Sequence, residues 1–192
     1  MGWNLLAPDW CEVDAVWKNP LPFILWPVCG KPLLAHWLDE ALRQEANSIT
    51  IYATDRPHLI RAWINRGNYW SNQIHVRVGG DRVESSITYT MNSLPGYEVF
   101  DSVSDGHRLL EHWFALHVYE IQERKPARFQ IDREISPGVW VAPGVVIDPL
   151  ARLIPPVWIG RRARIGPHCR IGPNAFISTR SVLDEDVEVI DA

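Results

Sequence analysis

The sequence has few of the features that mark several large classes of protein. Its three cysteines, Cys11, Cys29 and Cys169, are odd in number and lack the close spacing of a zinc or redox motif, so we expect reduced and mostly buried thiols. No apolar run reaches transmembrane length, and no basic stretch followed by an apolar run opens the sequence. We therefore expect a cytoplasmic protein with no membrane partner. A net charge of −4 gives no general reason to bind nucleic acid.

What the sequence does contain is an ordinary globular composition with an unusual number of large rings. The 192 residues are 46% hydrophobic and 22% charged, which is enough for one compact domain or for two small ones. Ten tryptophans are many for this length. Each needs a place for a large ring, so the composition predicts extensive buried contacts between layers, domains or subunits.

From Ile135 onward the sequence repeats every six residues. The fifth position of each repeat is small or β-branched, and proline fills the third position of six repeats, where its fixed φ suits a corner between short strands. This period is typical of a parallel β-helix. The first position is always aliphatic: Ile135, Val141, Ile147, Leu153, Ile159, Ile165, Ile171, Ile177, Leu183 and Val189.

The repeat resembles the left-handed parallel β-helix of the hexapeptide-repeat superfamily, in which three hexapeptides form one triangular coil. The resemblance implies about three coils of eighteen residues each. Trp140, Trp158 and Phe176 would then stack on one outer face at a spacing of about 4.8 Å. We predict that this aromatic ladder is an interface with the N-terminal part or with a neighbouring subunit. The alternative is that the helix around Trp113 covers the rings.

The repeat region is polarised in charge. Arginines gather at Arg161, Arg162 and Arg164, whereas acidic residues crowd the last repeats. The basic cluster is interpreted in three ways: as a phosphate or anion site, as an electrostatic contact between copies, or as a solvated basic face with an acidic tail that discourages edge pairing.

Before the repeat, helical and strand patterns alternate. Apolar periodicity predicts helices over 32–44, 55–66 and 107–122 and strands over 48–53 and 73–78. The alternation indicates a βαβ arrangement with a parallel sheet. Residues 83–105 have no clear pattern and are left unassigned. The fold prediction is therefore α/β: a short Rossmann-like βα domain over residues 1–128, followed by the β-helix over residues 129–192.

One N-terminal segment resembles NDP-sugar pyrophosphorylases, which are sugar-phosphate nucleotidyltransferases. The stretch ILWPVCGKPLLAHWLDEAL looks like the segment after the phosphate loop of that family, in which a Pro-Val-x-Gly-Lys-Pro turn opens a helix. The matching residues are Pro27, Val28, Gly30, Lys31 and Pro32. The resemblance implies that Gly30 and Lys31 are the remnant of a nucleotide-phosphate site. The order of a nucleotidyltransferase-like domain and then a β-helix is also known in that superfamily.

The residues that carry the chemistry of that family are replaced. The replacements are Asp9 and Cys11 for two glycines, Glu12 for a threonine, Val13 for an arginine and Phe23 for a lysine. Glycines let backbone N–H groups approach phosphates, and basic side chains neutralise the charge that develops in phosphoryl transfer. Carboxylates beside a triphosphate would instead repel it. We expect no metal and no cofactor, with Mg²⁺ relevant only if residual nucleotidyltransferase activity exists.

Four functions follow from these patterns. The preferred one is a catalytically degenerate assembly or regulatory subunit in sugar-nucleotide or polysaccharide metabolism, which forms a homo-oligomer through the β-helix and possibly binds an active nucleotidyltransferase. The second is an active pyrophosphorylase with an atypical site. The third is a hexapeptide-repeat acyltransferase, with His168 as the base. A carbonic-anhydrase-like metal site would need three histidines on neighbouring coils, and the repeat has only His168.

Overall fold

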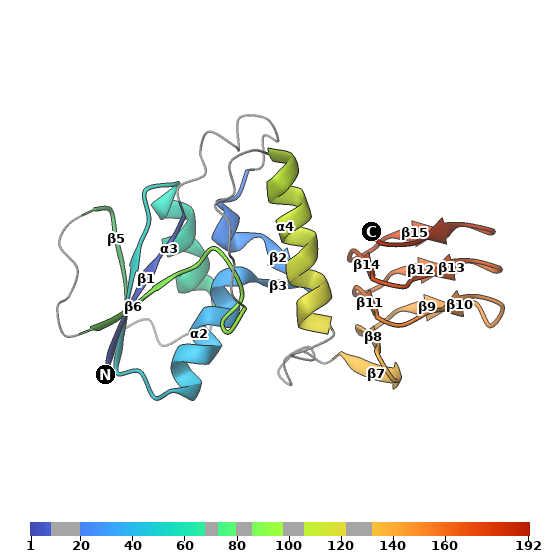
Figure 1. Cartoon of the computed structure of the whole chain (residues 1–192), viewed down its shortest axis with the longest axis horizontal. Coiled ribbons are helices and arrows are strands. Elements are labelled where there is room, and N and C mark those ends of the chain that lie inside the picture. The colour runs from blue at the N-terminus through green and yellow to red at the C-terminus, as the bar shows by residue number, and fades with distance from the viewer. Residues whose placement is uncertain (9–19, 68–72, 80–85, 98–105, 122–131) are drawn as a thin grey trace. The chain divides into compact units, whose positions relative to one another are not determined.

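The computed structural model describes residues 1–8, 20–67, 73–79, 86–97, 106–121 and 132–192 (Figure 1). The chain divides into two compact units, and each is described by itself. The first unit comprises Met1–Pro27 and Lys31–Leu110, and the second comprises Val28–Gly30 and Glu111–Ala192. The domain boundary predicted between residues 128 and 129 lies outside the described residues and stays a prediction.

The first unit is built on a four-stranded parallel sheet. Its strands are β1 (Gly2–Leu6), β4 (Ser48–Tyr52), β5 (Ile74–Arg77) and β6 (Ser86–Thr90), in the order β5-β4-β1-β6. The strands predicted over 48–53 and 73–78 are both present, and they pair in parallel. Strand β6 lies within the segment that the sequence left unassigned. It pairs with β1 on the side away from β4, so the strand order reverses at β1 as in the first half of a doubly wound sheet.

Helices α2 (Leu33–Arg43) and α3 (Pro57–Arg66) follow β1 and β4 in the chain. Proline at the first position of α3 fits the N-terminal turn of a helix, and the backbone leaves the helical conformation at Gly67, which is extended with a φ of −81° and a ψ of 155°. Trp37 of α2 packs on Tyr89 of β6 with ring centroids 5.4 Å apart, and its indole N–H donates to the Ser93 carbonyl oxygen over 2.7 Å. These contacts attach α2 to one face of the sheet.

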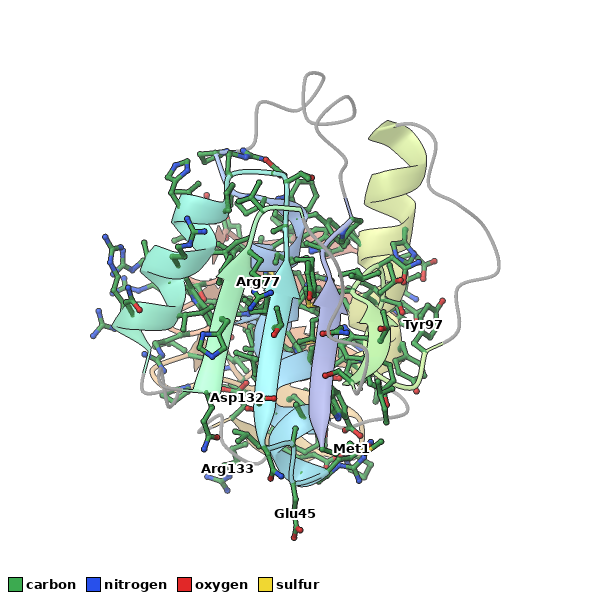
Figure 2. The ribbon with its side chains drawn as sticks, turned by 90° about the vertical axis from the view of Figure 1, so that its left-hand side faces the viewer. Met1, Glu45, Arg77, Tyr97, Asp132 and Arg133 are labelled. Carbon is green, nitrogen blue, oxygen red and sulfur yellow. The ribbon has the colours of Figure 1, made fainter. Side chains whose placement is uncertain are left out.

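The opposite face of the sheet carries a polar row. Asn4 of β1 lies between Thr50 of β4 and Thr88 of β6, and His75 of β5 follows Thr50. Figure 2 looks onto the four strands, with Arg77 of β5 labelled. Because side chains alternate across a strand, the row of Asn4 cannot share the apolar face of Trp3 and Leu5.

A tight hairpin lies directly before α2. After the short 3₁₀ helix η1 (Phe23–Leu25), strands β2 (Pro27–Val28) and β3 (Lys31–Pro32) pair around a two-residue turn. Both turn residues have positive φ, 47° at Cys29 and 76° at Gly30. This is the geometry of a type I′ turn, which matches the twist of the flanking strands.

The second unit contains a three-sided parallel β-helix, as the hexapeptide period predicted. Strands of this β-helix that lie eighteen residues apart in the sequence pair in parallel. The left-handed sense, which came from the resemblance, stays a prediction. The first side holds β8 (Val139–Val141), β11 (Val157–Ile159) and β14 (Ala175–Ile177), the second β9 (Val146–Ile147), β12 (Arg164–Ile165) and β15 (Val182–Leu183), and the third β10 (Arg152–Leu153), β13 (Arg170–Ile171) and β16 (Glu188–Val189).

The aliphatic first positions and the small fifth positions fill the interior of this β-helix. Val157, Ile159 and Ile171 are fully buried, and Ile165 is 3% exposed. The interior is lined by apolar side chains that are closely packed, which explains why the small residues Ala163, Ala175 and Cys169 occupy fifth positions. Strand β7 (Arg133–Ser136) pairs antiparallel with β8, and helix α4 (Gly106–Tyr119) confirms the helix predicted to precede the repeat.

Candidate functional site

The aromatic ladder predicted from the sequence is present on the first side of the β-helix. Trp140, Trp158 and Phe176 are direct neighbours across β8, β11 and β14. The rings of Trp158 and Phe176 are stacked, with centroids 4.8 Å apart and an interplanar angle of 8°. Offset stacking of this kind adds about 0.5–1.5 kcal/mol beyond simple burial. The ladder is therefore an ordered aromatic surface on one side of the coils.

Residues of the same unit cover this ladder. Trp158 is 2% exposed and packs with Cys29 and Ile121. From α4, the ring of His117 lies 4.0 Å from that of Phe176, centroid to centroid, and Trp113 meets Phe176 edge-on at 6.0 Å. The alternative that a helix around Trp113 covers the rings thus describes Phe176 correctly. A role of the ladder at a subunit interface stays a prediction.

Gly30 also belongs to this aromatic cluster. A Cβ placed on Gly30 would lie 2.9 Å from Cη2 of Trp158, closer than carbon atoms approach in proteins, and the backbone there has a positive φ. The turn and the ring contact each require glycine at this position. The resemblance assigned Gly30 to a phosphate site, and the structure gives it a packing role as well.

Lys31, the second motif residue, forms an ion pair with Asp39 of α2 in the first unit. Its side chain is 11% exposed. Phe23, at the position of a phosphate-contacting lysine in the resembling family, is buried and packs on Trp26 with ring centroids 5.5 Å apart. The other replaced positions, Asp9, Cys11, Glu12 and Val13, lie outside the described residues.

A half-buried carboxylate that the sequence pattern did not indicate is hydrogen-bonded to the ladder. The indole N–H of Trp158 donates to Oδ2 of Asp132 over 3.1 Å. Burial raises the pKa of Asp132, although this hydrogen bond and the positive charge of Arg161 oppose the rise. Asp132 comes just before the first repeat in the sequence, where no periodicity marks it.

Cys29 lies in the same cluster as a neutral thiol. Burial raises the pKa of the Cys29 thiol well above its ordinary value, and the nearby carboxylates of Glu120 and Asp132 raise it further. Because a thiolate is the reactive form, this environment makes Cys29 a poor nucleophile. Its Sγ lies 3.8 Å from the carbonyl oxygen of His117, which accepts from it.

His168 occupies a corner of the β-helix. It is exposed, has a φ of 57°, and lies one coil from Leu150 on one side and from Asp186 on the other. Within the part of the chain that the structure describes, no hydrogen bond holds its ring. A general base in acyl transfer is normally oriented by a second group, and the described residues provide Asp186 only as a neighbour in the stack.

The basic cluster lies at a different corner. Arg161 and Arg162 occupy the second coil there, and Arg180 stacks beside Arg162 on the third, since the Arg180 backbone N–H donates to the Arg161 carbonyl oxygen over 2.9 Å. Arg164 follows on β12. All four side chains are exposed. The structure therefore brings the predicted cluster together and adds Arg180 to it.

Residues 138–173 match the family model of the bacterial transferase hexapeptide (six repeats). The match covers the first two coils of the β-helix, including Trp140, Trp158, Arg162 and His168. It supports the sequence interpretation of the C-terminal region as a hexapeptide repeat. No curated protein matches the chain.

A shallow basic groove in the first unit was not anticipated from the sequence. It has a volume of about 400 Å³ and lies between α3 and the edge strand β5. Nη2 of Arg61 donates to the Val76 carbonyl oxygen over 3.1 Å, so this arginine covers an outward-facing carbonyl of the edge strand. His75 and Arg77 complete the basic lining. Protection of a strand edge by a charged side chain is a common device against aggregation.

No group of three His, Cys, Asp or Glu side chains in the described ranges is arranged to hold a metal ion. Among the helices that the structure describes, none is both long and apolar enough to span a lipid bilayer.

Proposed function

We propose that this protein is a catalytically degenerate relative of the sugar nucleotidyltransferases and that it acts as an assembly or regulatory subunit through its hexapeptide β-helix. The observation that carries the proposal is the ion pair between Lys31 and Asp39. A lysine that serves a phosphate must present its ammonium group to the ligand, whereas this one is largely buried and already neutralised by a carboxylate.

The other motif positions that the structure describes support the same proposal. Gly30 is packed against Trp158, and Phe23 is buried in place of a basic side chain. Phosphoryl transfer depends on positive groups and backbone N–H donors that face the charge developing in the transition state. With the side chain of Lys31 paired and an aromatic ring at position 23, the described part of the motif offers little of either.

The β-helix supports the assembly part of the proposal. Its coils form a rigid, regular surface, and the region matches a transferase hexapeptide family whose members commonly form oligomers. An active nucleotidyltransferase is the hetero-partner that the resemblance suggests.

The proposal is tested by incubating the purified protein with nucleoside triphosphates and sugar phosphates, with and without Mg²⁺. Pyrophosphate release and the melting temperature are measured in parallel. We expect no release above the background of the Lys31→Ala variant and no stabilisation by any triphosphate. A ligand at 100 times its Kd would add about 2.7 kcal/mol, so binding would be visible. Mg²⁺-dependent release that disappears in Lys31→Ala would overturn the proposal.

Acyl transfer is the second candidate, because the family match includes the exposed His168. In that reaction the histidine would take a proton from an amine or hydroxyl nucleophile, which attacks the thioester carbon while the coenzyme A thiol leaves. The test is the release of free thiol from acetyl-CoA in the presence of a panel of amines and amino sugars. Release that is lost in His168→Ala would replace the first proposal with this one.

A further inference from the structure

The edge strand β5 presents backbone groups that point away from its sheet. It is the outermost of the four strands and has β4 as its neighbour (Figure 2). The Arg77 carbonyl oxygen accepts from the Ala53 backbone N–H over 3.0 Å, so the backbone groups of Arg77 face β4. Because successive residues of a strand turn these groups to opposite edges, Ile74 and Val76 present theirs outward. Within the described ranges, only Arg61 bonds to them, through the Val76 carbonyl oxygen.

The groove beside this edge is partly apolar. It lies between α3 and β5, and its lining includes Ile64, Ile74 and Val76. The side chains of Ile74 and Val76 are partly exposed, and Val78 is 57% exposed. Since side chains alternate along a strand, Ile74, Val76 and Val78 share one face and form an apolar strip along the edge. A strand added beside β5 would cover this strip with apolar side chains at every second position.

The groove is also positively charged. Arg61 of α3 and both His75 and Arg77 of β5 line it, all three are exposed, and none of the lining residues is acidic. Among the described residues, no side chain forms a hydrogen bond or an ion pair with that of His75 or Arg77. Guanidinium groups that no carboxylate neutralises favour an anionic partner. Arg61 does not close the edge, because a carbonyl oxygen has two lone pairs and a guanidinium has five N–H groups.

We propose that β5 and this groove bind an extended acidic segment of a partner protein, which adds to the sheet as a fifth strand. The backbone of the segment pairs with Ile74 and Val76, and its apolar side chains cover the apolar strip. Its acidic side chains alternate with the apolar ones and face His75 and Arg77, while Arg61 adds positive charge at the edge. Strand addition is a common mode of peptide recognition. The inference goes beyond the function proposed above and holds whether or not the protein turns over a substrate.

An extended peptide uses more of this surface than other anions do. A phosphate or a sugar phosphate would contact the guanidinium groups but leave the apolar strip and the outward N–H groups of β5 unused. A nucleic acid would be held chiefly through its phosphate charges. A strand combines backbone pairing, apolar contact and charge, and all three are present along the same edge.

A labelled synthetic peptide tests the proposal with the full-length protein. The probe has about eight residues, enough for one strand, in which valine and glutamate alternate. Fluorescence anisotropy at low salt should show saturable binding. A peptide of the same composition, with the valines in one block and the glutamates in another, should bind at least about tenfold less tightly because its two faces are no longer distinct. Equal binding of the two peptides would show that charge alone holds them and would overturn strand addition.

Backbone methylation of the peptide tests the pairing itself. One version carries methyl groups on the valine nitrogens and another on the glutamate nitrogens. A strand presents only every second N–H to a given neighbour, so one version should lose binding and the other should keep it. Which version loses binding also gives the direction of the added strand. Equal affinities of the two methylated peptides would contradict pairing with β5.

Charge removal from the protein provides the matched comparison. Arg61→Gln with Arg77→Gln should weaken binding of the alternating peptide by about tenfold. The control, Arg66→Gln with Arg133→Gln, removes the same charge from two exposed arginines that do not line the groove. It should change the affinity by less than about twofold. Both variants should melt like the native protein, since the substituted side chains are exposed. Absence of saturable binding to the native protein, or equal losses in the two variants, would overturn the inference.

Discussion

Gly30 lies directly against the indole of Trp158, so closely that a Cβ on Gly30 would be 2.9 Å from Cη2 of the ring. The contact joins a residue of the turn that resembles a nucleotide-binding motif to a residue of the hexapeptide repeat. A motif that resembles a phosphate-binding turn is therefore used, at this position, to pack an aromatic cluster. Packing against Trp158 and the positive φ are sufficient to account for glycine at position 30.

The first prediction concerns this contact. Gly30→Ala should lower the free energy of unfolding by about 2–4 kcal/mol, with about 1 kcal/mol from the left-handed backbone and the rest from overpacking against Trp158. Gly79→Ala is the matched control, because Gly79 has a φ of 71° and nothing within 4 Å of the added carbon. Urea unfolding of both variants provides the comparison. Equal losses would mean that the ring contact contributes nothing.

The interior column of the β-helix gives the second prediction. Ile165 is 3% exposed and lies between Ile147 and Leu183 in the stack. Ile165→Asp should cost more than about 4 kcal/mol and unfold the repeat, because a carboxylate there finds no partner. Arg152→Asp places the same side chain at an outward position, and its melting temperature should be close to that of the native protein. Circular dichroism melting distinguishes the two, and a native-like melt for Ile165→Asp would refute the register.

The half-buried carboxylate of Asp132 gives a pH-dependent prediction. Burial raises the pKa of Asp132 in the folded protein above the ordinary value of 3.8, which applies to the unfolded chain. Between the pKa of the unfolded chain and the higher pKa of the folded protein, the folded protein therefore binds more protons than the unfolded chain. Its contribution to stability is then lost as the pH rises through this window. Asp132→Asn keeps an oxygen acceptor for Trp158 and does not titrate. Relative to the native protein, Asp132→Asn should therefore gain stability as the pH is raised from about 4 to 7.

Urea titrations at several pH values measure that difference. Asp186→Asn removes an exposed carboxylate of the same unit and reports the general effect of losing one charge. Relative to that of the native protein, the free energy of unfolding of Asp132→Asn could instead be the same at every pH or larger at low pH. Either result would contradict a pKa of Asp132 raised by burial.

The thiol of Cys29 gives the fourth prediction. A buried thiol with a raised pKa carries little thiolate, so it should react slowly with an alkylating or disulfide reagent. In a Cys11→Ser background, neither Cys29 nor the buried Cys169 should be labelled by a chromogenic disulfide at pH 8 in the folded state. Both should react after unfolding in guanidinium chloride. Rapid labelling of Cys29 in the native protein would show that the aromatic cluster opens.

The hexapeptide region could be predicted almost completely, because one residue in six is fixed by the shape of the interior. The aliphatic column of Ile147, Ile165 and Leu183 needs no information from elsewhere in the chain. Strand β6 could not be found in this way. It is five residues long, and its apolar side chains Ile87 and Tyr89 give too short an alternation to distinguish a strand from a loop.

The candidate site was predictable in residue type but not in partners. The motif picked out Lys31, yet the carboxylate that neutralises it is Asp39, eight positions away on a helix that must form before the two meet. In the same way, the sequence showed the ladder of Trp140, Trp158 and Phe176 but not Asp132 beneath it. Partners that depend on the tertiary fold leave no periodic signal.

The eighteen-residue register also restricts how this protein can change in length during evolution. Deletion of one whole coil would keep every column on its own side and shorten the solenoid by a single step. Deletion of one hexapeptide would keep the interior filled, yet it would rotate everything after it by one side, so that Phe176 would leave the column of Trp158. Viable insertions and deletions between these two aromatic residues should therefore come in whole turns, even though the sequence itself repeats every six residues.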